Sequence, residues 1–123
     1  MIEALPDDVA HVLDFALSFA GAPSGVQLGM QIRHLRVQKR CACGCGSTYF
    51  SLDVDAVAPA LTLTGTQVVG DMEVLGERQE TIGQVQVFTE DGYLAWLEVC
   101  SWNDDSFTLA DAHRRLCPCL RRV

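Results

Sequence analysis

Three cysteines alternate with small residues in the segment Cys41-Ala42-Cys43-Gly44-Cys45-Gly46-Ser47. Residues two apart point to the same side of an extended chain, so the three thiols can converge where the backbone bends. Gly44 and Gly46 supply the conformational freedom for that bend. A tetrahedral zinc site needs about four ligands, with each sulfur about 2.3 Å from the metal. The triplet therefore supplies at most three ligands and needs a fourth from elsewhere in the chain.

A second group of thiols, Cys117-Pro118-Cys119, stands near the C-terminal end of the sequence. We expect these thiols to meet the triplet and to hold a structural zinc. The metal ligands would come from Cys41, Cys43, Cys45, Cys117 and Cys119. The spacing differs from the C-x2-C pattern typical of zinc sites. Disulfide or redox chemistry and a purely structural role of the thiols therefore remain alternatives.

The basic residues of the chain gather around these two cysteine groups. Eight of the nine Lys and Arg residues flank them: Arg33, Arg36, Lys39 and Arg40 precede the triplet, and Arg114, Arg115, Arg121 and Arg122 bracket the C-terminal pair. Cations are favourable beside a zinc centre with four thiolates, because that centre carries a net charge of about −2. Cations also favour reactive thiolates in the absence of a metal. The charge pattern thus indicates functional thiolates more than zinc in particular.

Length and charge limit the class of protein. A chain of 123 residues is expected to form a single domain over residues 1–123. The net charge of −7 argues against general binding to nucleic acid, which needs a surplus of cations, and favours a basic protein partner. No apolar run approaches the roughly 20 residues that cross a bilayer. The first basic residue is Arg33, so a signal peptide is not expected and the cytoplasm is the expected location.

Hydrophobic periodicity predicts an α+β fold. Pro6-Asp7-Asp8 is typical of a helix start, and Gly21 and Pro23 end that helix. A second helix is expected from Ser24 to about Arg33, although alternation there also allows a strand. Alternating residues predict strands at 35–40, 48–54, 67–75, 82–89 and 93–102, and a last short helix at 109–116. We therefore expect two N-terminal helices packed on an antiparallel meander of four or five strands, followed by a short C-terminal helix.

The expected strand at 93–102 carries four side chains of interest. Trp96, Cys100 and Trp102 share one face by alternation. Core packing is the expectation for the tryptophans and for Cys100, and an exposed surface for a partner is the alternative. Glu98 stands between two apolar neighbours, so its carboxylate faces either a cleft or water.

Two segments resemble a motif of small uncharacterised bacterial proteins, C-x-C-G-C-x-[ST] followed by a β-meander. The first is Arg40-Cys41-Ala42-Cys43-Gly44-Cys45-Gly46-Ser47, and the second is Asp91-Gly92-Tyr93-Leu94-Ala95-Trp96-Leu97-Glu98-Val99. The family has no assigned activity, so the resemblance implies a bacterial cytosolic setting without a mechanism.

The sequence contains no G-x-S-x-G, P-loop or H-E-x-x-H pattern, so common hydrolase and nucleotide-binding signatures are absent. This absence, the acidic charge and the clustered thiols favour a non-enzymatic binding or interaction protein with a structural zinc. One alternative is a thiol redox protein that uses the C-x-C-G-C segment. Another is an acidic immunity or adaptor-type protein with incidental cysteines.

Overall fold

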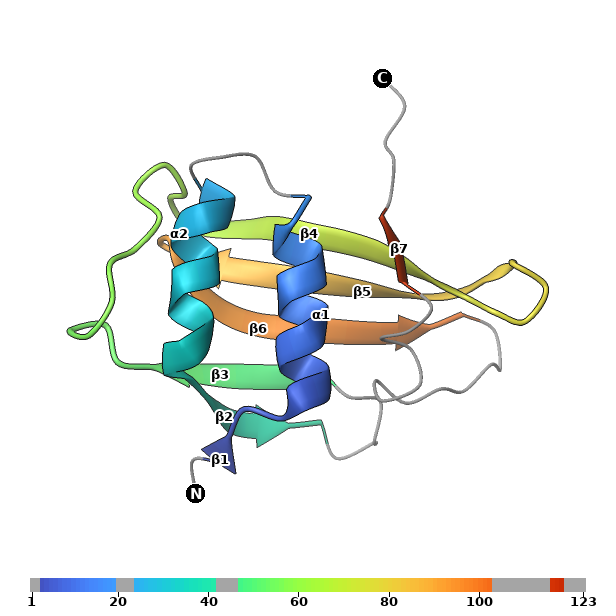
Figure 1. The fold of residues 1–123 in the computed structure, drawn as a ribbon, viewed down its shortest axis with the longest axis horizontal. Coiled ribbons are helices and arrows are strands. Elements are labelled where there is room, and N and C mark those ends of the chain that lie inside the picture. Colours follow the sequence, from blue (N-terminus) through green and yellow to red (C-terminus); the bar gives the residue numbers. More distant parts are fainter. Residues whose placement is uncertain (1–2, 20–23, 42–46, 103–115, 119–123) are drawn as a thin grey trace.

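An antiparallel sheet forms the base of the fold, and two helices lie across one of its faces (Figure 1). The computed structural model describes residues 3–19, 24–41, 47–102 and 116–118. Within these residues the helices are α1 (Asp7–Leu17) and α2 (Ser24–Gln31), and a 3-10 turn follows at Ile32–His34. The seven described strands are β1 (Glu3–Ala4), β2 (Leu35–Arg40), β3 (Thr48–Leu52), β4 (Thr66–Leu75), β5 (Thr81–Glu90), β6 (Tyr93–Ser101) and β7 (Leu116–Pro118).

The strand order is β1-β2-β3-β6-β5-β4-β7, with every described pair antiparallel. Strands β4, β5 and β6 form a meander, and β2 and β3 form a hairpin. The two units join through β3 and β6, where Thr48 pairs with Leu97 and Tyr49 pairs with Trp96. The meander therefore meets the hairpin through its last strand and not through its first.

Helix α1 covers the β4 side of the sheet. Asp7 and Asp8 occupy its first turn, where carboxylates favour the positive end of the helix dipole. Its apolar stripe is buried against the sheet and consists of Val9, Val12, Leu13, Ala16 and Leu17. The helix approaches β4 closely at Gly70, where an added Cβ would lie 2.8 Å from the Cβ of Ala16.

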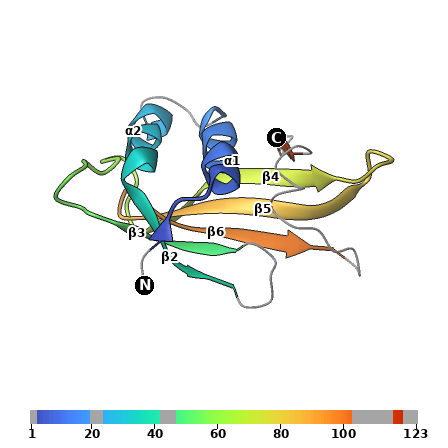
Figure 2. The same cartoon turned by 60° about the horizontal axis from the view of Figure 1, so that its bottom comes forward.

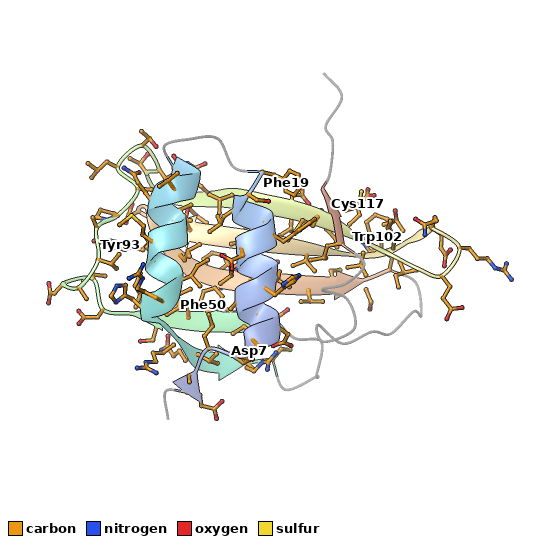
Figure 3. The ribbon with its side chains drawn as sticks, in the orientation of Figure 1. Asp7, Phe19, Phe50, Tyr93, Trp102 and Cys117 are labelled. Carbon is orange, nitrogen blue, oxygen red and sulfur yellow. The ribbon has the colours of Figure 1, made fainter. Side chains whose placement is uncertain are left out.

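The sheet faces the helices with alternate residues of its strands. These residues include Phe50, Met72, Val74, Val85, Val87, Leu97 and Val99, all of them buried in one apolar cluster with α1 and Leu28 of α2. Figure 3 labels Phe50 beneath the helices. A single core thus lies between the helices and one face of the sheet.

Gln31, the last residue of α2, is 0% exposed and ties the helix to the β5–β6 hairpin. Its Nε2 donates to the carbonyl oxygens of Ala58 (3.1 Å) and Gly92 (3.0 Å). Its Oε1 accepts the backbone N–H of Leu94 at 2.8 Å. Both polar atoms of the buried amide therefore have hydrogen-bond partners, as is usual for a polar group in a core.

The β5–β6 turn follows the expected hairpin chemistry. Asp91 and Gly92 have φ angles of 48° and 86°, the left-handed values that a tight two-residue hairpin turn requires. The Asp91 carboxylate accepts the N–H of Gly65 at 2.9 Å, so the turn also holds the start of β4.

The predicted fold is wrong in its strand number and in its C-terminal helix. The described sheet has seven strands where four or five were expected, because β1 and β7 add to its two edges. The predicted helix at 109–116 ends on Leu116, and this residue instead begins β7, which pairs with β4. Residues 109–115 lie outside the described residues. Strand β7 forms because its backbone pairs with the edge of β4, a contact between distant parts of the chain. Three residues are too few to show the alternation that predicts a strand from sequence.

Candidate functional site

The structure places the described cysteines of the two groups, Cys41 and Cys117, at separate positions across the sheet. Cys41 directly follows β2, and its N–H donates to the carbonyl oxygen of Ser47 at 2.9 Å, which closes the base of the β2–β3 loop. Cys117 lies in β7 and pairs with Glu73 of β4 (Figure 3). Five inter-strand spacings separate β2 from β7 in the strand order, on the order of 20 Å. Cys41 and Cys117 are therefore not brought together.

The other predicted zinc ligands, Cys43, Cys45 and Cys119, lie outside the described residues. Within the described part of the chain, no group of three or more His, Cys, Asp or Glu side chains is arranged to hold a metal ion. A zinc site built on the triplet stays a prediction. The placement of Cys41 and Cys117 does not support the version of that site in which both cysteine groups share one ion.

The face of the sheet opposite the helices, which we call the open face, is covered by no described helix or strand (Figure 2). Three aromatic side chains from neighbouring strands cross it in one row. The rings of Tyr49 and Trp96 stack at 6.4 Å between centroids, and those of Trp96 and Phe88 stack at 4.6 Å with an angle of 8° between their planes. We call these three residues the aromatic ladder.

Strand pairing extends the row beyond the aromatic ladder on both sides. Val68 of β4 pairs with Phe88 and is 47% exposed, and Lys39 of β2 pairs with Tyr49, which is 45% exposed. Val68 and Tyr49 are three inter-strand spacings apart, about 14 Å. The open face thus offers an apolar row that is wide enough for several side chains of a partner.

Carboxylates lie on the same face as the aromatic ladder, with Asp71 and Glu98 in the next row along the strands and Glu73 one row further. Glu98 follows Trp96 by two residues on β6, and its Oε1 accepts the indole N–H of Trp96 at 3.2 Å. Asp71 accepts a hydrogen bond from Nε2 of Gln84, and Glu73 accepts one from the Thr81 hydroxyl at 3.1 Å. These hydrogen bonds hold the three carboxylates in defined positions. We call Asp71, Glu73 and Glu98 the carboxylate group.

Charge is divided unevenly across the open face. Arg36 and Lys39 lie on β2, at one side of the aromatic ladder, whereas the carboxylate group lies on β4 and β6. Within the described residues, neither Glu73 nor Glu98 forms an ion pair. The negative charges of Glu73 on β4 and Glu98 on β6 are therefore available to a basic ligand.

The open face resolves the alternatives for the strand at 93–102. Trp96 stacks in the aromatic ladder on the open face and Cys100 is exposed, so the expectation that they pack in the core between helices and sheet is wrong. Glu98 is exposed to water. Sequence reasoning missed Tyr49 and Phe88 as partners of Trp96. One signal was present: Phe88 shares its strand face with the polar residues Gln84 and Gln86, whereas the alternate residues Val85 and Val87 form the apolar face.

Comparisons of this chain with protein-family models, with curated proteins and with solved structures return no match. In the described ranges, neither helix is long and apolar enough to span a bilayer. The site must therefore be interpreted from its own geometry.

Proposed function

We propose that this protein is a non-enzymatic binding protein that holds a basic protein partner on its open face. The observation that carries the proposal is the aromatic ladder, which continues across three strands on a face that no described element covers. Large aromatic side chains provide much of the binding energy at protein interfaces. The carboxylate group on the same face and the net charge of −7 indicate that the partner is positively charged.

Single-stranded nucleic acid is another class of ligand that stacks on aromatic residues of a sheet. Such ligands bring phosphates, and phosphate binding needs a positively charged groove. Positive charge from Arg36 and Lys39 lies only on the β2 side of the aromatic ladder, whereas Glu98 and Asp71 on β6 and β4 repel a phosphate backbone from the rest of the face. The electrostatics of the open face therefore favour a protein partner.

Selection of displayed random dodecapeptides on the purified protein tests this proposal. Peptides that bind the open face are expected to lose about tenfold or more in affinity for the Tyr49→Ala variant, because an exposed anchor ring is removed. Phe19→Ala is the matched control, since Phe19 is an exposed aromatic residue that follows α1 on the helix side (Figure 3). The proposal would be contradicted if the selected peptides bound the Tyr49→Ala and Phe19→Ala variants with equal affinity. It would also be contradicted if the wild-type protein bound an oligouridylate more tightly than it binds these peptides. Circular dichroism establishes that each variant is folded.

We further propose that the C-x-C-G-C segment holds a structural zinc, with the thiol redox role as its rival. The Cys41–Ser47 hydrogen bond supports the proposal because it closes a short loop that contains the rest of the triplet. Elemental analysis of protein purified in reducing buffer is expected to find about one zinc per chain, lost in the Cys43→Ser variant. Metal-free protein whose thiols react rapidly near neutral pH would favour the redox role instead.

A further inference from the structure

We infer that the partner segment carries an apolar side chain followed two residues later by an arginine, and that Glu98 is the residue that selects this arginine. The inference rests on the proposed function, because it specifies which basic segment the open face accepts. It follows from the position of Glu98 relative to Trp96, from the hydrogen bond between them and from the division of charge across the face.

The spacing comes from the geometry of β6. Trp96 and Glu98 are two residues apart on one strand, so their side chains leave the same face about 7 Å apart. An extended peptide that lies along β6 repeats this spacing between its own residues i and i+2. Its apolar side chain then rests on the aromatic ladder while its next side chain on that face reaches Glu98.

The chemistry comes from the way the Glu98 carboxylate is held. The indole N–H of Trp96 occupies Oε1 at 3.2 Å, whereas no described residue donates to Oε2. The bond fixes the carboxylate before a ligand arrives, which lowers the cost of ordering it on binding. A guanidinium presents several N–H groups in one plane and so matches a fixed carboxylate better than an ammonium does. The aliphatic part of an arginine also packs against aromatic rings.

The surrounding charges place the basic segment over β6, β5 and β4. Gln86 pairs with Asp71 on one side and with Glu98 on the other, so the two carboxylates lie in one row, two inter-strand spacings or about 10 Å apart. Arg36 and Lys39 on β2 repel the segment from the opposite side of the aromatic ladder.

Fluorescence anisotropy with labelled nonapeptides tests the inference. The probe is GFGRGFGRG, in which phenylalanine and arginine have the proposed spacing, and the comparison peptide has lysine in place of each arginine. For the wild-type protein we expect at least threefold tighter binding of the arginine peptide. In Glu98→Gln, which keeps an oxygen acceptor for the Trp96 indole, we expect about a tenfold loss for the arginine peptide and no remaining preference. Glu77→Gln is the matched control, because it removes the same charge from an exposed turn residue.

The outcomes separate this inference from the proposed function. Equal binding of the arginine peptide by wild type, Glu98→Gln and Glu77→Gln would overturn the inference, as would selected peptides that depend on Tyr49 but lack basic residues. In both cases the open face would still be the binding surface. If no peptide depends on Tyr49, the proposed function fails together with the inference.

Discussion

Replacement of Gln31 by leucine tests whether one buried amide stabilises the junction of α2 and the β5–β6 hairpin. Gln31 is 0% exposed and forms three hydrogen bonds. In Gln31→Leu, the N–H of Leu94 loses its acceptor inside the core. The carbonyl of Gly92 keeps the N–H of Ala60 at 2.8 Å, and Ala58 is an exposed residue whose carbonyl can turn to water. The main cost is therefore one buried donor without a partner.

An unsatisfied buried backbone donor costs about 1–3 kcal/mol. Leucine is close to glutamine in size, so it fills the same space and adds only a little apolar contact. This contact offsets only part of the cost of the unsatisfied donor. We expect Gln31→Leu to lower the free energy of unfolding by about 2 kcal/mol, a fall in Tm of several degrees for a chain of this length. Urea denaturation followed by circular dichroism measures the change, and an unchanged m-value would show that the midpoint reports stability.

Gln38→Leu is the control for this measurement. Gln38 is exposed on β2, so the same chemical change there is expected to alter the free energy of unfolding by no more than about 0.5 kcal/mol. If Gln31→Leu is as stable as the wild type to within the same margin, the three hydrogen bonds do not stabilise the fold and the reasoning is refuted.

Three further predictions concern the sheet. Gly92→Ala is expected to lower the free energy of unfolding by more than about 1 kcal/mol, because φ is 86° and the new Cβ would lie 2.5 Å from the carbonyl oxygen of Ala60; an unchanged thermal midpoint would contradict this. Gly70→Ala is expected to be destabilising because its Cβ meets that of Ala16 at 2.8 Å, and Ala16→Gly in the same chain should restore part of the loss in a double-mutant cycle. Purely additive effects would exclude that contact as the cause. Cys100→Ser is expected to change the free energy of unfolding by less than about 0.5 kcal/mol, since the thiol is exposed, and a larger loss in urea denaturation would show a structural role.

Local patterns predicted the elements that depend on local physics. The helices α1 and α2 and the five longer strands lie within about three residues of their expected bounds, because each contains enough residues to show its period. The turn at Asp91 and Gly92 was also predictable, because few residue pairs adopt two successive positive φ angles. The two edge strands were missed because two or three residues show no period.

The candidate site was less accessible to sequence reasoning. Alternation placed Trp96, Glu98 and Cys100 on one face, but it gave no information on which face the helices would cover. That choice depends on the apolar stripe of α1 meeting Met72 and Val74 on the other side of the sheet. Cys41 and Cys117 were expected to meet on the basis of similar composition and charge, whereas strand order separates them.

The sequence by itself determined the helices, the longer strands, the β5–β6 turn and the acidic charge, since each depends on neighbouring residues or on a sum over the chain. Only the tertiary structure decided that β3 pairs with β6, and this pairing alone brings Tyr49 beside Trp96. Such contacts form between strands far apart in the chain, and their register is set by the burial of a whole face. The aromatic ladder and the carboxylates beside it are therefore properties of the assembled sheet.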